Sequence, residues 1–271
     1  MASNKAIVLI TGANTGLGYE AVKALLATSE SHILLGTRSI QKGQDAIAKL
    51  QSEVPNSKST IEVLQVDVTS DESIEKAFNE VSSKHDHLDV LVNNAGVNLE
   101  RDAQDGKLSL REAWMGMWST NVVGAHIMSH TFMPLLIKSK TPRLIFITSG
   151  TSSLIETQNF DGPLARINAS PKAGWPKPAE ANPVIGYRSS KTGMNMLVTQ
   201  WARVLREDGV KVFAVSPGFL ATNLNSLSGD ALRKMGAIEP HIGGEFLRDV
   251  IVGRRDDQTV RMIRKDAVQP W

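Results

Sequence analysis

Tyr187 and Lys191 are separated by about one turn in a stretch whose pattern predicts a helix over residues 187–205. Residues four apart on a helix share one face. A free phenol has a pKa near about 10, which is too high for efficient acid–base work at neutral pH, and a neighbouring ammonium favours the phenolate. We therefore expect Lys191 to lower the pKa of Tyr187 and the pair to exchange protons with a bound molecule.

Residues 11–18 read Thr-Gly-Ala-Asn-Thr-Gly-Leu-Gly and lie between a predicted strand at 6–10 and a predicted helix at 16–27. Glycines in such a loop let backbone N–H groups approach a pyrophosphate, and the helix N-terminus adds a partial positive charge. No Lys-Ser/Thr pair follows the glycines, which disfavours a phosphate loop of the nucleotide-hydrolase type. Glycine turns after strands also occur for purely structural reasons, so the loop alone predicts a dinucleotide site only weakly.

Arg38 follows the second predicted strand, where the adenosine ribose lies in a dinucleotide site. An acid at this position binds the ribose 2′-hydroxyl, whereas an arginine suits a 2′-phosphate. No Asp or Glu ends this strand. We therefore expect NADP(H) rather than NAD(H), the alternative being that Arg38 is a solvated loop charge.

Short apolar runs and helical patterns alternate along most of the chain, which is typical of a parallel sheet with helices on both faces. We expect a single α/β domain over 1–271, a Rossmann-type doubly wound parallel seven-stranded sheet flanked by helices. The predicted strands are 6–10, 33–36, 61–66, 88–92, 144–147, 210–215 and 259–263, and the remaining predicted helices are 42–53, 73–81, 109–137 and 245–252.

The rhythm breaks between residues 150 and 186, where five prolines exclude a long helix or a central strand. This proline-rich insertion starts beside Ser149 and ends beside Tyr187. We expect it to form a wall of the substrate pocket, with Trp175 and Phe160 as apolar cover; the alternative is a surface decoration.

Three motifs together resemble the short-chain dehydrogenase/reductase family: the glycine-rich loop, Asn93-Asn94-Ala95-Gly96, and Tyr187-x-x-x-Lys191. The resemblance covers the chain from the first strand to Thr222, and a carbonyl reductase or ketoreductase with an insertion before the tyrosine is the nearest type. It implies the catalytic set Asn121, Ser149, Tyr187 and Lys191. It also implies cofactor contacts from Gly12, Asn14, Thr15, Gly16, Leu17, Gly18, Arg38, Asp67, Val68, Asn94, Ala95, Gly96, Tyr187, Lys191, Pro217, Gly218, Leu220 and Thr222.

The resemblance also implies roles for the catalytic set. Tyr187 supplies a proton to the new alkoxide, Ser149 donates to the substrate oxygen, and Lys191 also binds the nicotinamide ribose. Asn121 fixes a water that relays protons through Lys191. The implied substrate is a small ketone, aldehyde or alcohol. One departure is Thr15, because some NADPH-using members carry a basic residue inside the glycine loop.

Composition narrows the function classes further. A net charge of +2 indicates neither a nucleic-acid nor a membrane-surface partner, and the absence of cysteine excludes disulfides, Cys-ligated zinc and a thiol nucleophile. No apolar run is long enough for a signal peptide or a membrane span, so we expect a cytoplasmic protein, as a monomer or homodimer. His126 and His130 are four apart but lack an evident third ligand, so no metal site is predicted.

Two other functions stay open at this stage. A catalytically silent protein of the same fold could bind NADPH as a sensor, although it would not need all four residues of the catalytic set. A sugar-nucleotide epimerase or dehydratase usually has a larger C-terminal substrate region than the residues that follow Pro217-Gly218 here.

Overall fold

One eight-stranded sheet runs through the molecule in the order β3-β2-β1-β4-β5-β6-β7-β8. The computed structural model describes residues 5–162, 164–178, 184–225 and 227–271. Pairing is parallel from β3 to β7, and β8 is antiparallel to β7. The strands are β1 (Ala6–Ile10), β2 (Ser31–Thr37), β3 (Thr60–Gln65), β4 (Val90–Asn93), β5 (Arg143–Ile147), β6 (Lys211–Val215), β7 (Met262–Ile263) and β8 (Val268–Gln269).

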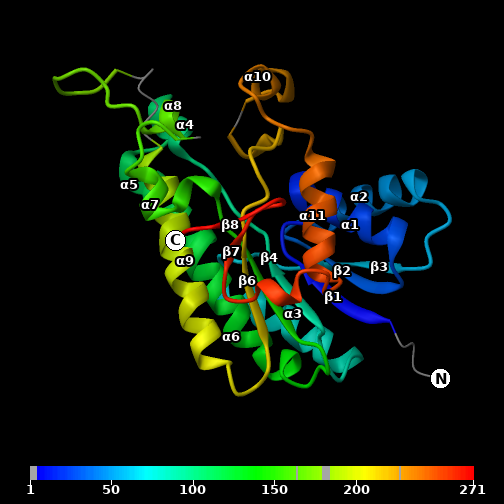
Figure 1. The fold of residues 1–271 in the computed structure, drawn as a ribbon. Coiled ribbons are helices and arrows are strands. Elements are labelled where there is room, and N and C mark those ends of the chain that lie inside the picture. The colour runs from blue at the N-terminus through cyan, green and yellow to red at the C-terminus, as the bar shows by residue number, and fades with distance from the viewer. Residues whose placement is uncertain (1–4, 163, 179–183, 226) are drawn as a thin grey trace.

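Helices cover both faces of this sheet, α1, α2 and α11 on one side and α3, α6 and α9 on the other (Figure 1). Among the described residues, no helix has the length and apolar character needed to cross a membrane. The helices are α1 (Gly16–Thr28), α2 (Ile40–Glu53), α3 (Asp71–Lys84), α4 (Glu100–Gln104), α5 (Leu110–Trp118), α6 (Ala125–Leu136), α7 (Leu154–Thr157), α8 (Ala165–Asn168), α9 (Ile185–Val204), α10 (Gly229–Lys234) and α11 (Pro240–Ile251).

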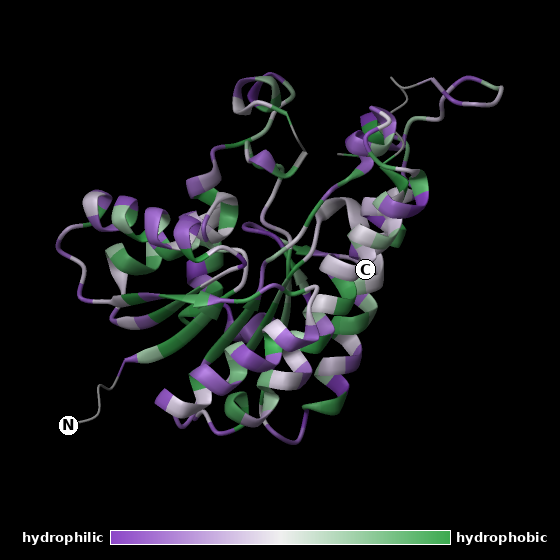
Figure 2. Cartoon of the chain, turned by 180° about the vertical axis from the view of Figure 1, so that it is seen from behind, coloured by the Kyte–Doolittle hydropathy of each residue, from purple (hydrophilic) through white to green (hydrophobic). Residues whose placement is uncertain are grey.

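The apolar runs of the strands explain this arrangement, because side chains alternate between the two faces. In β1, Val8 and Ile10 pack under α1 and α11, while Leu9 packs under the opposite helices. Hydropathic colouring shows the apolar residues gathered on the strands and on the helix surfaces that face them (Figure 2). A sheet covered on both faces requires such continuous apolar strands.

The predicted α/β architecture is confirmed, with one strand more than the seven expected. The extra strand, β8, has two residues and pairs with β7 near the end of the sequence. Two residues are too few to show a period of two, which is why the pattern did not reveal it.

The predicted helix over 109–137 is instead three segments. Between α5 and α6 lies a π-helical segment, Ser119–Gly124. Such segments carry a wider turn than an α-helix and occur frequently at functional sites.

The order of the strands reverses at β1, which has β2 on one side and β4 on the other. In an open parallel sheet, ligands bind outside the carboxyl ends of the strands at such a reversal. Residues that follow β1, β4 and β5 therefore converge on one crevice.

Candidate active site

Asn94 and Thr11 hold the glycine-rich loop against the strand ends. The Asn94 side-chain Nδ2 donates to the carbonyl oxygen of Thr11 at 2.7 Å and to that of Gly12 at 3.2 Å. The Thr11 hydroxyl accepts hydrogen bonds from the backbone N–H groups of Asn94 and Ala95, at 3.1 and 3.0 Å. These bonds confirm that two motifs far apart in the sequence form one structure.

Close packing explains two of the glycines in the loop. Gly12 has a φ of +64°, and a Cβ there would lie 3.0 Å from the Cα of Ala95. A Cβ on Gly18 would lie 2.6 Å from Nδ2 of Asn94. Side chains at these positions would displace the loop, so backbone, rather than side chains, forms the surface that a ligand meets.

An open cleft of about 720 Å³ borders this loop, α2 and the segment after β6. The N-cap residue of α1, Thr15, makes no side-chain capping bond, so the N–H groups of the first turn stay available to an anion. Thr222 closes the far side, because a Cβ on Gly16 would lie 3.7 Å from its side chain. The lining includes Asn14, Thr15, Gly16, Lys42, Ala221, Thr222 and Asn223.

Arg38 is exposed directly after β2, at the strand end where the sequence places it. Burial acts to raise the pKa of Asp67, but hydrogen bonds from Thr69 and the positive charge of Arg38 outweigh it and hold that pKa below its usual range. Arg38 and Asp67 therefore lie close enough to interact. The residues that follow β2 and β3 are therefore neighbours, and their role in binding a cofactor stays a prediction.

Lys42 is a cation that the sequence analysis did not assign to the cleft. It lies in the first turn of α2 and lines the cleft beside Asn14 and Thr15. Its ammonium has no hydrogen bond or ion pair within the described ranges. The signal that would have found it is its position four residues after Arg38, because α2 begins between them and turns the side chain back toward the loop.

Ser149, Tyr187 and Lys191 come together where β5 ends against α9. The Ser149 hydroxyl lies near enough to that of Tyr187 to affect its pKa, and it is hydrogen-bonded to the Thr151 hydroxyl at 2.9 Å. The Lys191 Nζ lies 5.9 Å from the centre of the Tyr187 ring and donates to the carbonyl oxygen of Ile147 at 2.7 Å. The spacing of Tyr187 and Lys191 on one helical face is therefore as predicted.

The expected direction of the Tyr187 pKa is wrong for this structure. Burial raises the pKa of Tyr187 to about 12, and the neighbouring hydroxyl of Ser149 only partly opposes the rise. Burial also lowers the pKa of Lys191 to about 7, so at neutral pH the lysine is only partly charged. A partly charged amine cannot favour the phenolate strongly, and Tyr187 stays protonated.

Asn121 is fully buried in the π-helical segment, and its side-chain amide is hydrogen-bonded to Val97 and Ser190. Its Oδ1 accepts from the Val97 N–H at 2.8 Å, and its Nδ2 donates to the Val97 carbonyl and to Ser190 Oγ, both at 3.0 Å. A Cβ on Gly96 would lie 3.2 Å from Asn121 Oδ1 and 3.5 Å from Lys191 Nζ. Asn121 thus joins the segment after β4 to α9, next to the lysine.

The remaining predicted cofactor residues lie in the segments that follow β3 and β6 and in the first turn of α1. The loop after β6 turns at Gly218, whose φ is +99°, and continues to the buried Leu220 and to Thr222. The backbone of Val68 packs against Gly124 of the π-helical segment. Leu17 packs against the core beneath the glycine-rich loop.

Glu100 is a second residue that the sequence analysis missed. Its buried carboxylate accepts from the backbone N–H of Tyr187 at 3.0 Å and from that of Gly186. Burial raises the pKa of Glu100 above its usual range, and these two bonds oppose the rise. The carboxylate anchors the first turn of α9, which carries Tyr187. Nothing local in the sequence relates Glu100 to residues so far along the chain.

The insertion divides into an anchored base and an exposed tip. Arg188 donates to the Thr151 carbonyl at 2.9 Å and to Asn168 Oδ1 at 2.8 Å, which ties the base to α9. The tip projects away from the body of the protein (Figure 1). Trp175 is 86% exposed and Phe160 57% exposed, so in this structure neither gives the apolar cover that the sequence suggested. Pro163 and Pro183 lie outside the described residues.

Comparisons with known proteins agree with this geometry. A family model for short chain dehydrogenases matches residues 6–159 and 167–232. The short-chain dehydrogenase/reductase eupG of Phoma sp. is 49% identical over 280 residues, 100% of this chain and 99% of the relative. The short-chain dehydrogenase/reductase tropE of Talaromyces stipitatus is 46% identical over 99% of this chain and 99% of the relative.

Two solved structures share the fold. The NADPH-bound carbonyl reductase from chicken fatty liver has a TM-score of 0.75 at 23% identity, covering 98% of this chain and 99% of that one. L-sorbose reductase from Gluconobacter frateurii, solved with NADPH and L-sorbose, has a TM-score of 0.72 at 17% identity, covering 96% of this chain and 94% of that one.

Proposed function

Because the chain belongs to the short-chain dehydrogenase/reductase family, we propose that it is an NADPH-dependent reductase that converts a small ketone or aldehyde to an alcohol. The observation that carries this proposal is the meeting of Ser149, Tyr187 and Lys191 beside the glycine-rich loop. All described strands join one sheet, which supports a single domain as the functional unit. Cytoplasmic location and a monomer or homodimer stay predictions from the sequence.

The glycine-rich loop and its flanks offer groups that suit a dinucleotide. Glycine backbone and the uncapped turn of α1 suit a pyrophosphate, and Arg38 with Lys42 suits a 2′-phosphate. Two structures of this fold were solved with NADPH, which supports the same cofactor here. A bound nicotinamide supplies the hydride, and the chain itself supplies binding, orientation and the proton.

The raised pKa of Tyr187 suits the reductive direction. A carbonyl oxygen becomes basic as it receives hydride, and it then needs a protonated donor. Tyr187 is protonated at neutral pH, and the Ser149 hydroxyl beside it can donate to the same oxygen. Lys191, with a pKa of about 7, can give a proton to the tyrosinate or take one from solvent near neutral pH.

The test is a panel of ketones and aldehydes mixed with the protein and NADPH, read as loss of the absorbance of the reduced cofactor. We expect at least one substrate to be turned over, and the Tyr187→Phe variant to bind NADPH without turnover. NADPH binding without oxidation by any member of a broad panel would favour a silent sensor of the same fold. Failure to bind NADPH would reject both functions.

A further inference from the structure

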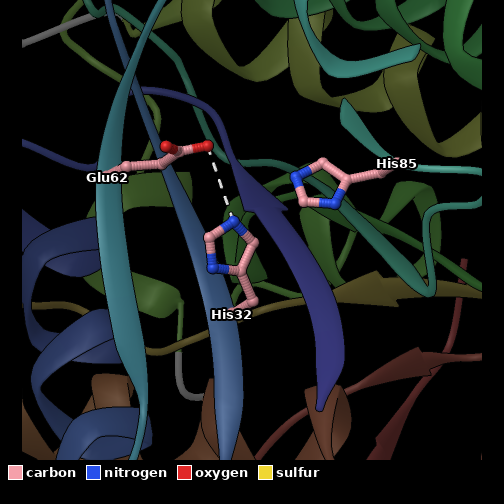
Figure 3. Close-up of side chains that lie close together, drawn as sticks. All are labelled: His32, Glu62 and His85. Carbon is pink, nitrogen blue, oxygen red and sulfur yellow. Dashed lines mark ion pairs between the residues drawn. The ribbon is translucent and has the colours of Figure 1, made fainter. Parts of the chain in front are cut away.

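Two histidines and a glutamate meet on the face of the sheet that α3 covers. His32 lies near the start of β2, Glu62 lies in β3, and His85 directly follows α3. In the parallel register, His32 pairs with Thr60 and Leu34 with Glu62, so the side chains of His32 and Glu62 are on one face. Figure 3 shows both imidazoles and the carboxylate turned toward a common point.

The ligand atoms of these three side chains all lie within 4.8 Å of one another. His32 Nε2 and Glu62 Oε1 are 3.5 Å apart. Ligand atoms around a tetrahedral zinc ion are separated by about 3.4 Å, given bond lengths near 2.0–2.2 Å. One pair thus already has the required separation, and small side-chain rotations bring the third ligand in.

Each of the two imidazoles leaves one ring nitrogen without a hydrogen bond among the described residues. His32 Nε2 and His85 Nε2 are both buried, and neither has a hydrogen-bond partner in the part of the chain that the structure describes. Buried polar atoms normally find partners, so two such nitrogens aimed at one carboxylate require an explanation. A metal ion satisfies both nitrogens at once.

The surroundings set His32 up as a ligand. His32 Nδ1 lies 2.8 Å from the Thr60 hydroxyl. When Nδ1 carries the proton and donates to Thr60, Nε2 presents its lone pair, which is the arrangement that orients metal-bound histidines.

Lys84 is the cation that competes for the carboxylate. Its Nζ lies 3.7 Å from Glu62 Oε1 but 2.9 Å from Glu80 Oε1. The closer partner can keep the ammonium when Glu62 binds a metal. Two nitrogens and one oxygen form a donor set suited to zinc, with a water in the fourth position.

We propose that His32, Glu62 and His85 bind one zinc ion that joins β2, β3 and the end of α3. The site lies at the amino end of β2, on the order of 20 Å from Arg38 at its other end. Its role is therefore structural, and it is separate from the crevice that holds the cofactor.

The test uses the full-length protein after chelator treatment, titrated with Zn²⁺ by calorimetry and with Co²⁺ by visible absorption. We expect one equivalent to bind, tetrahedral Co²⁺ bands to appear, and the thermal unfolding midpoint to rise with Zn²⁺. His85→Gln and His32→Gln should each weaken binding by about 100-fold or more and abolish the shift in midpoint. Thr60→Val should weaken binding about tenfold, because it removes only the partner of Nδ1.

His130→Gln is the matched control, since His126 and His130 form the other histidine pair, with ring centres 6.4 Å apart. This variant should bind zinc like the parent. NADPH binding reports that each variant is folded, and Glu62→Gln replaces any histidine variant that does not fold. Absence of one-equivalent binding in the parent, or parent-like binding in a folded His85→Gln or Glu62→Gln variant, overturns the proposal and leaves the cluster as a packing contact.

Discussion

The two sides of the crevice are held in different ways. On the glycine-loop side, Asn94 and Thr11 fix the backbone through four hydrogen bonds between segments far apart in the chain. On the insertion side, Arg188 fixes the base, but the tip carries Trp175 at 86% exposure. The glycine-loop side is therefore held rigidly by its hydrogen bonds, whereas the tip of the insertion has few contacts that restrict its motion.

This difference separates the chemistry from the choice of substrate. A hydride donor must be held in one geometry, which the glycine-loop side supplies. Substrate shape is decided by loops, which change without disturbing the sheet that supports them. We therefore expect substitutions near Tyr187 to alter turnover strongly and substitutions at the insertion tip to alter it little.

The largest effect is expected for Tyr187→Phe, which removes the hydroxyl and keeps the ring. Turnover should fall by about 1,000-fold or more, because no other acid replaces the phenol, while NADPH affinity stays within about twofold. Steady-state kinetics and quenching titrations measure the two quantities. Lys191→Met should lower both the turnover and the affinity for NADPH. A Phe variant with a tenth of the parent rate would show that the proton comes from elsewhere.

The next effect concerns the adenosine corner of the rigid side. Arg38→Asp should lower kcat/KM for NADPH about 100-fold, because a charge-assisted bond to the phosphate becomes a repulsion, and should change the NADH value less than about threefold. Lys42→Gln should lower the NADPH value about threefold. Arg206→Asp, with the same change of charge on an exposed residue of the chain, is the control. Equal efficiency of the parent with both cofactors would contradict the assignment.

Glu100→Gln tests whether the buried carboxylate positions the first turn of α9. The amide keeps one acceptor but turns N–H groups toward the other backbone donor, so kcat should fall about tenfold with KM for NADPH unchanged. Glu100→Asp, which keeps the charge, should recover part of the rate. A loss confined to KM for NADPH would show that Glu100 does not act through Tyr187.

Glu100→Gln should also change how the free energy of unfolding depends on pH. The folded-state pKa of Glu100 is raised, so the folded protein binds more protons than the unfolded chain above the ordinary pKa of a glutamate. The unfolding free energy of the parent should therefore fall, relative to Glu100→Gln, as pH rises from about 4.5 through the raised value. Denaturant titrations across that range measure this difference, and parallel curves would argue against a buried charge.

The smallest effect is expected at the insertion tip. Trp175→Ser should leave kcat and KM for any substrate within about twofold, because the indole is exposed to solvent in this structure. Kinetics on the best substrate of the panel decide this point. A rise in KM beyond about fivefold would show that the tip folds over the substrate, and the contrast between the two sides would then no longer hold.

The parts that the sequence predicted are those governed by local pattern. Apolar runs followed by glycine or asparagine predict strand ends at one edge of a parallel sheet, and Tyr187 and Lys191 need only a helix between them. The parts that it missed depend on pairing between distant segments, as for Glu100 with the start of α9 or His32 with His85. The predicted direction of the Tyr187 pKa shift was wrong because burial of the phenol outweighs the effect of the Lys191 amine. The spacing of two residues in a sequence does not report burial.

The π-helical segment between α5 and α6 sets which side of α5 faces the core. Ala113, Met117, Asn121 and Ala125 are all buried although they are spaced by four, and in an uninterrupted α-helix that spacing drifts by about 40° at each step. One extra residue in the wide turn absorbs about 100° of this drift. Deleting a single residue there would turn α5 about its axis, and Met117, which packs on Gly186 beside Tyr187, would move to a different face. The length of this segment, counted in residues, thus sets the angle at which one wall meets the reacting tyrosine.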